Sequence, residues 1–227
     1  MTITQLRALA DSVEGARPVA LHAESIGMRR EMRNMLVAAS GLRSVTCWTR
    51  VYTLDVPGTG PVVIGSGALG GLRAEDFDQR RPAAQARVAH ALAHASRVLP
   101  LGGAEPSLGH TTAPHAVAAG LVVIPMPGIA PGARMVYARL AGAREYLFTG
   151  DIARTDLNWR EMRLPARLAA PHQSRAQRAE NLAWLTTINA LHRAAPQMVI
   201  LAGSDIRETP FSARTLSDQP GGTSDWP

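Results

Sequence analysis

The 227-residue chain contains no lysine, because all 24 of its basic residues are arginine. A phosphate-binding P-loop and a Schiff-base nucleophile both need a lysine amine, so the sequence excludes both. Aromatic residues make up only 4% of the chain, which leaves few rings to stack on nucleic-acid bases. We therefore do not expect a nucleic-acid partner, although the net charge is +6.

Cysteine and long apolar runs are equally scarce. The single cysteine, Cys47, cannot form an internal disulfide and is predicted to be an inert strand residue. No apolar run approaches the roughly 20 residues that a membrane-spanning helix needs. The first residues lack the charged start and apolar core of a signal peptide, so we expect a cytoplasmic protein. Abundant arginine and alanine are typical of a GC-rich genome, which favours a bacterial source.

The hydrophobic content of 46% is enough for one substantial core, and no linker divides the chain. We predict a single domain over residues 1–209. Residues 210–227 have no apolar periodicity and are rich in Pro, Gly, Ser and Asp, so they are predicted to be a disordered tail.

Apolar periodicity and turn residues predict a mixture of strands and helices. Helices are expected over 82–96 and 174–194. The second is the better signalled, because Ser174 and Gln177 fit a capping box and Pro196 stops it. Its core-facing residues are predicted to be Leu182, Leu185, Ile188 and Leu191. Strands are expected over 19–23, 45–54, 62–64, 97–99, 121–125, 135–140, 146–148 and 198–201. The last is expected to be buried on both faces if helices cover the sheet.

The segment from Val123 to Asp151, VIPMPGIAPGARMVYARLAGAREYLFTGD, has a Pro-Gly turn, two strands and a terminal Gly-Asp. It resembles the middle of a metallo-β-lactamase-fold hydrolase, in which Gly-His-Thr-Pro-Gly leads into two strands and the final aspartate bridges two metal ions. The segments 61–67, 77–99 and 191–205 resemble other parts of that family in the right order. The resemblance implies an α/β protein, an αββα sandwich of the metallo-β-lactamase type.

Most metal ligands of that family have no counterpart in this chain. Ile129 stands where the family has the histidine of Gly-His-Thr-Pro-Gly, and Ser204 stands where it has its last histidine. The His-x-His-x-Asp-His loop should fall in 99–110, where His110 is the only histidine. Asp151 is then the single matched ligand. Without a metal, its carboxylate must reach solvent, cap the next turn or pair with an arginine such as Arg154.

A catalytic zinc ion needs about three protein ligands and supplies the activated water, so the resemblance implies a degenerate member without catalytic residues, metal or cofactor. Its former cleft, at Asp151, Ile129, Ser204 and Asp205, could bind a small molecule or a protein partner. The alternative is a metal-dependent hydrolase of an ester or lactone bond. It would bind zinc through a rebuilt site at His110, His115 and Asp151.

Three other patterns have simpler interpretations. His90 and His94 have zinc-binding spacing, but Ala91 replaces the general-base glutamate of a zinc protease, and we place both at a solvent-exposed helix edge. Glycines 65, 67 and 70 match a dinucleotide fingerprint, but proline follows before a helix can begin there. Ser66 and Ser204 end predicted strands without a histidine to activate them.

Overall fold

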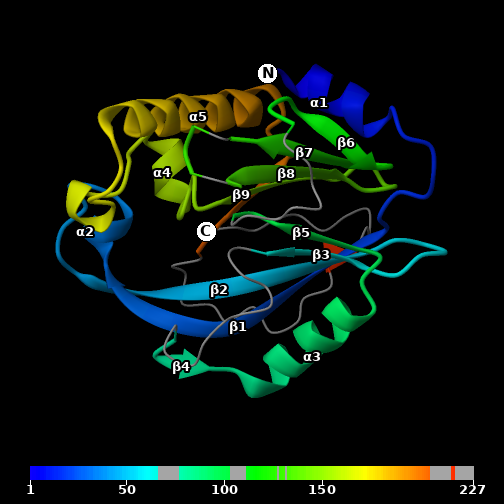
Figure 1. Ribbon diagram of the computed structural model, residues 1–227, viewed down its shortest axis with the longest axis horizontal. Helices are drawn as coiled ribbons and strands as arrows, with labels where there is room; N and C mark the ends of the chain where they lie inside the picture. The colour runs from blue at the N-terminus through cyan, green and yellow to red at the C-terminus, as the bar shows by residue number, and fades with distance from the viewer. Residues whose placement is uncertain (66–76, 103–110, 127, 131, 205–215, 218–227) are drawn as a thin grey trace.

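The computed structural model describes residues 1–65, 77–102, 111–126, 128–130, 132–204 and 216–217. The elements form four layers, which Figure 1 shows from bottom to top: a helix, a sheet, a second sheet and a group of helices. The predicted αββα sandwich is therefore confirmed.

The first sheet has the strand order β11-β1-β2-β3-β5, and β4 also pairs with β1. All of its ladders are antiparallel except the one between β3 and β5. Its strands are β1 (Ala20–Met32), β2 (Ser44–Asp55), β3 (Val62–Gly65), β4 (Gln79–Arg80), β5 (Arg97–Pro100) and β11 (Leu216–Ser217). The strand β11 is the described part of the predicted tail.

The second sheet has the strand order β10-β9-β8-β7-β6. Only the ladder between β10 and β9 is parallel. Its strands are β6 (His115–Ala118), β7 (Leu121–Pro125), β8 (Arg134–Arg139), β9 (Glu145–Gly150) and β10 (Val199–Ala202). Because β10 lies at the sheet edge, only Ile200 of its four residues is buried, and the prediction of burial on both faces was wrong.

The main core fills the space between the two sheets. Alternate residues of each strand point inward, as the period of a β-strand requires. The rings of Tyr52 and Phe148 meet edge to face with centroids 5.0 Å apart. Other buried members are Leu21, Ala23, Leu54, Val62, Ile64, Leu99, Leu121, Val123, Val136, Ala138 and Tyr146. This layer holds the two sheets together and fixes which strand ends lie opposite each other.

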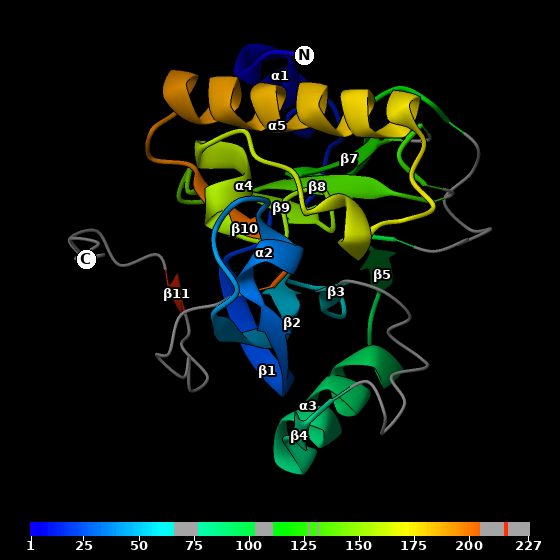
Figure 2. The same cartoon turned by 90° about the vertical axis from the view of Figure 1, so that its left-hand side faces the viewer.

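Helices cover the outer face of each sheet (Figures 1 and 2). The helix α3 (Pro82–Ala93) packs Ala84 and Val88 against the first sheet, and it ends three residues before the predicted end. The helices α1 (Ile3–Ala10), α4 (Asp156–Arg160) and α5 (Arg175–Ala194) lie on the second sheet. The capping box of Ser174 and Gln177 is confirmed. The core-facing prediction was wrong for Leu182, whose side chain is exposed.

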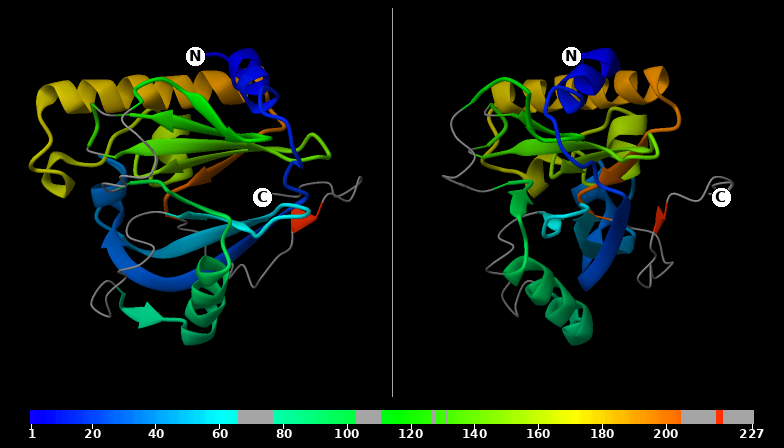
Figure 3. Two further views of the ribbon diagram at one scale, coloured as in Figure 1. Left: turned by 45° about the vertical axis from the view of Figure 1, so that its right-hand side comes forward. Right: turned by 90° about the vertical axis from the view of Figure 1, so that its right-hand side faces the viewer.

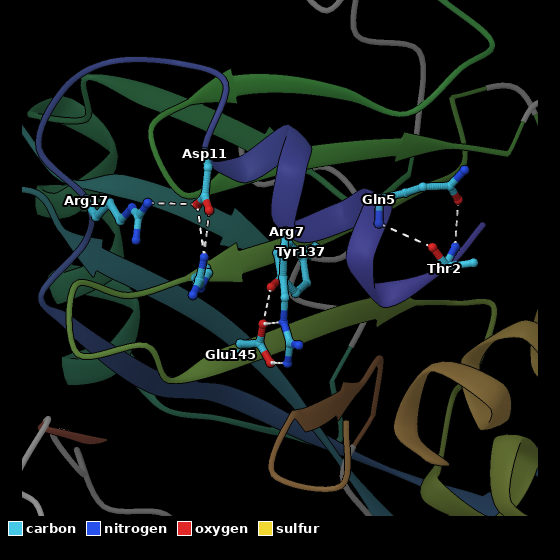
Figure 4. Close-up of polar contacts among 8 residues, drawn as sticks. Thr2, Gln5, Arg7, Asp11, Arg17, Tyr137 and Glu145 are labelled. Carbon is cyan, nitrogen blue, oxygen red and sulfur yellow. Dashed lines mark hydrogen bonds and ion pairs between the residues drawn. The ribbon is translucent and has the colours of Figure 1, made fainter. Parts of the chain in front are cut away.

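The helix α1 was not predicted from the sequence. An ion-pair cluster anchors it to the second sheet (Figure 4). Arg7 donates two hydrogen bonds to the carboxylate of Glu145, at 2.7 and 2.8 Å. The buried hydroxyl of Tyr137 donates to the same carboxylate. Burial alone would raise the pKa of Glu145, but hydrogen bonds from Arg7 and Tyr137 outweigh it and lower that pKa.

The paired strands β1 and β2 continue well past the end of β3 and form an arm that bends along one side of the molecule (Figure 3, left). The short helix α2 (Arg33–Leu36) lies at its tip. Backbone hydrogen bonds from Ala38 to Leu164 and from Ala166 to Asn34 attach this tip to the segment after α4. The predicted strand over 19–23 was therefore too short, because the polar second half of β1 is stabilised by its ladder with β2.

Candidate functional site

The carboxyl ends of five strands meet at one edge of the sandwich, which we call the mouth. β3 is parallel to β5, β10 is parallel to β9, and β7 has the same direction as β9 because both are antiparallel to β8. The two sheets touch at this edge, where the amide of Arg134 donates to the carbonyl of Leu101 at 3.3 Å. Figure 2 views the molecule from this side, with α2 and α4 in front.

Two glycines allow the strand ends to approach closely. A Cβ on Gly150 would lie 2.9 Å from the Cβ of Leu101, and Gly150 has a φ of +54°. A Cβ on Gly203 would lie 2.3 Å from the carbonyl oxygen of Gly150. Both contacts are shorter than a side chain tolerates, so glycine is required at both positions. The Gly-Asp and Gly-Ser pairs of the sequence thus sit together at the mouth.

Asp151 lies in the turn after β9, and its side chain is exposed. Of the three arrangements expected for this carboxylate, the structure therefore shows contact with solvent. Arg154 does not serve as its partner, since its guanidinium donates to Glu31 of β1 at 2.8 Å. The arm thereby makes contact with the turn that carries Asp151.

Ser204 is close to that turn as well. Its amide donates to the carbonyl of Arg154 at 2.8 Å, and the amide of Gly203 donates to the carbonyl of Ala153 at 3.0 Å. The end of β10 is thus fastened to the turn after β9, and the structure brings the surroundings of Asp151 and Ser204 together. Asp205 lies outside the described residues.

Ile129 occupies a different environment. It is 7% exposed and belongs to the hydrophobic cluster between the second sheet and the helices above it, together with Met126, Met135 and Leu185. Its carbonyl accepts a hydrogen bond from Gln177 in the first turn of α5, at 3.2 Å. At this position an isoleucine completes the core under α5.

His115 lies far from the turn after β9. It begins β6, the edge strand, and its register runs through Val123 of β7 and Val136 of β8 to Phe148 of β9. Three strand spacings correspond to about 14 Å. Nδ1 of His115 lies 3.1 Å from both the hydroxyl of Thr111 and the carbonyl of Ala113. The third residue of the alternative zinc site, His110, lies outside the described residues.

The described residues do not supply the ligands of a zinc site. Within that part of the chain, no three His, Cys, Asp or Glu side chains are grouped so that they could hold an ion. His90 and His94 have ring centroids 4.3 Å apart on α3, and both are exposed, as predicted. Cys47 is buried in β2. Burial, with a smaller effect from Glu31, raises the pKa of its thiol to about 11, so it stays protonated at neutral pH.

Two buried arginines near the mouth were missed by the sequence reading. Arg50 of β2 is 8% exposed and Arg134 of β8 is 6% exposed. Strand alternation places Arg50 on the face of Tyr52 and Leu54, and it places Arg134 on the face of Val136 and Ala138. Both therefore belong to the inner faces of the sheets. Each arginine lies two residues from an apolar residue of its strand that faces inward, and this spacing could have predicted its position.

A second ion-pair cluster lies near the tip of the arm, just before α2. Glu31 accepts hydrogen bonds from Arg154 and from Arg29. Burial alone would raise the pKa of Glu31, but the hydrogen bonds and charges of the two arginines outweigh it and lower that pKa. This carboxylate therefore stays ionised and links the arm to the turn after β9.

Comparison with known proteins identifies the fold. No protein-family model and no curated protein matches the chain. Solved structures do, including a quorum-quenching N-acyl homoserine lactone lactonase with a TM-score of 0.65 and 12% identity over 89% of this chain and 98% of that one. A mutant of AiiA from B. thuringiensis, with N-decanoyl-L-homoserine bound at its active site, has a TM-score of 0.61 and 13% identity over 84% and 94%.

A probable metal-dependent hydrolase from Staphylococcus aureus is also similar, with a TM-score of 0.60 and 10% identity over 90% of this chain and 95% of that one. The chain has the metallo-β-lactamase fold that these hydrolases share, and the resemblance noted in the sequence is confirmed. Identities this low establish the fold and leave the activity to the residues at the mouth. Among the described helices, none has both the length and the apolar character needed to cross a membrane.

Proposed function

We propose that this chain is a metallo-β-lactamase-fold protein that has lost the dinuclear zinc site and hydrolytic activity, and that it binds a small ligand or a protein partner at the mouth. The observation that carries the proposal is the environment of two positions that match metal ligands of the resembled family. Ile129 completes an apolar core, and Asp151 is an exposed carboxylate. A zinc ion needs about three ligands around it, and one carboxylate does not hold it.

The second candidate is a metal-dependent hydrolase of an ester or lactone bond with zinc at His110, His115 and Asp151. The similar lactonase structures favour it. The ladder register opposes it, because His115 starts a strand about 14 Å across the sheet from β9. An aspartate and a histidine that share one ion must both reach it within a few ångströms, and this separation is too large for that.

The metal content of the purified protein tests the proposal. After exposure to zinc and dialysis, we expect well under one ion per chain by elemental analysis. In urea unfolding, a chelator should leave the free energy of unfolding of the parent unchanged. Asp151→Asn should cost about 0.5 kcal/mol or less, because the carboxylate is exposed.

The opposite result would establish the hydrolase candidate. It consists of one or more retained zinc ions, together with a chelator that destabilises the parent by several kcal/mol and has no effect on Asp151→Asn. His90→Ala is the matched control, since it removes an exposed histidine on α3, away from the mouth.

A further inference from the structure

Four exposed apolar side chains lie at one end of the molecule. Met32 and Leu42 belong to the tip of the arm, and Met162 and Leu168 belong to the segment after α4. Leu42 and Leu168 are 74% and 75% exposed, the largest values among the large apolar residues of the described chain. A single exposed leucine needs no explanation, but a group of apolar side chains on one surface marks an interaction site. We call these four residues the end patch.

Hydrogen bonds hold the two halves of the end patch beside each other. The amide of Ala166 donates to the carbonyl of Asn34 at 3.2 Å, and the amide of Asn34 donates to the carbonyl of Gly41 at 3.0 Å. The short helix η3 (Arg167–Ala169), which carries the second leucine, contacts α2. Figure 1 shows the tip of the arm and this yellow segment side by side at the left end of the molecule, and Figure 2 views the molecule from that end.

Arginine is abundant around the end patch, and acidic residues are scarce. Residues 32–44 and 161–178 contain six arginines and one acidic residue, Glu161. That carboxylate is already paired with an arginine at 2.7 Å. Arg43 and Arg167 are exposed, and neither pairs with a carboxylate of the described residues. The end patch therefore combines apolar side chains with positive charge that is free to bind an anionic partner.

We propose that the end patch binds the surface of a membrane that contains anionic lipids. Leu42 and Leu168 enter the boundary between headgroups and acyl chains, as the apolar residues of interfacial segments do. Arg43 and Arg167 bind lipid phosphates, because a guanidinium fork matches a phosphate by two parallel hydrogen bonds. Arginine near an anionic lipid surface adds electrostatic attraction to the apolar contact. Such binding is peripheral and needs no helix that crosses the membrane.

Other occupants match these residues less well. A second copy of the chain would place the same arginines against each other, because a twofold interface uses one patch on both subunits and like charges repel. Nucleic acid matches the charge, but it is bound through phosphates and through stacking on aromatic rings, which leaves the leucines without partners. A protein partner is anchored by side chains buried in pockets, whereas both leucines are largely exposed. An anionic membrane matches the apolar and the charged side chains together.

Sedimentation with lipid vesicles tests the inference at pH 7 and about 0.1 M salt. One set of vesicles contains phosphatidylcholine alone, and the other contains about 30% phosphatidylglycerol, which supplies negative charge. The parent protein should sediment with the anionic vesicles and bind the neutral ones at least about fivefold less. No binding to the anionic vesicles, or equal binding to both sets, overturns the inference.

Serine substitutions test the apolar contribution. The double variant Leu42→Ser and Leu168→Ser should bind anionic vesicles at least about fivefold less than the parent, because it loses the apolar contact. Its Tm should match that of the parent, since both side chains are exposed. Val19→Ser is the matched control, because Val19 is 40% exposed and precedes β1, at the opposite end of that strand from the arm tip. Undiminished binding in the double variant would show that charge alone holds the protein to lipid and would overturn the inference.

Glutamine substitutions test the charged contribution. The double variant Arg43→Gln and Arg167→Gln should lose at least about fivefold in binding to anionic vesicles. Arg97→Gln is the control, because Arg97 is exposed at the start of β5, at the edge opposite the mouth. An equal loss in the control would assign the effect to net charge and contradict a defined patch.

Amide hydrogen exchange of the parent protein provides a measurement that needs no variant. Anionic vesicles should slow exchange in residues 41–44 and 166–170 and leave residues 56–60, in the turn between β2 and β3, unchanged. Slowing confined to other segments overturns the inference. Size-exclusion chromatography without lipid tests the competing occupant. A dimer that the two leucine substitutions convert to a monomer would assign the end patch to a second copy of the chain.

Discussion

Two arginine–glutamate clusters in this protein use the same chemistry in different balances. Under α1, the carboxylate of Glu145 accepts hydrogen bonds from Arg7 and from Tyr137, so both of its oxygens have donors. At the tip of the arm, Glu31 is shared by Arg29 and Arg154. The first cluster joins a helix to a sheet. The second joins the arm to the turn that carries Asp151.

The difference lies in how the donors are matched to the carboxylate. A buried ion pair stabilises a fold only when its partners are well matched, because removing charges from water is costly. The cluster under α1 meets that condition with 7% exposure of the Glu145 side chain. In the second cluster two arginines share the carboxylate of Glu31, whose side chain is 13% exposed.

The largest effect is expected from Glu145→Ala. Truncation leaves the buried Tyr137 hydroxyl without its acceptor and removes the bidentate partner of Arg7. We expect a loss of about 3 kcal/mol in the free energy of unfolding, measured by urea denaturation. Arg17→Gln breaks an exposed contact with Asp11 and should cost about 0.5 kcal/mol or less. Similar losses in the free energy of unfolding for both variants would show that the cluster under α1 does not stabilise the fold.

Acid should weaken both clusters. Glu31 and Glu145 have pKa values below the ordinary value of 4.5 in the folded chain. As pH falls through 4.5, the unfolded chain takes up these protons first, so stability is fully present above that pH and is lost below it. The urea concentration at the midpoint of unfolding, measured between pH 7 and pH 3, should decrease once the pH is below about 4.5. In Glu145→Gln, this decrease at acid pH should be smaller than in the parent. An equal decrease would contradict the contribution of Glu145 to the loss of stability in acid.

A smaller loss of stability than for Glu145→Ala is expected from Glu31→Gln. The amide still offers one acceptor, and Arg29 is half exposed, so the cost should be about 1 kcal/mol. Urea denaturation measures this cost. A cost as large as that of Glu145→Ala would remove the contrast between the two clusters.

Regular apolar patterns allowed many elements to be predicted. The strand β7 begins and ends where predicted, and α5 was found with its capping box, because both have strong local signals. The helix α1 was missed, although Thr2 and Gln5 form a capping box, because its short apolar stripe is stabilised largely by packing and by Arg7. Leu182 is exposed because the buried face of α5 runs through Asn181, Leu185 and Ile188, and Leu182 lies to one side of that face.

From the sequence by itself, the resemblance indicated the αββα class, and apolar periods predicted the long strands and the helices α3 and α5. Residue identity alone placed Ile129 and Ser204 where the resembled family has histidines. Only the tertiary structure decided which groups share the mouth. The strand register moved His115 about 14 Å across the sheet and packed Ile129 under α5. It also brought Arg50 and Arg134, 84 residues apart by number (134 − 50), to one edge. Such contacts depend on how two sheets face each other, which no local pattern records.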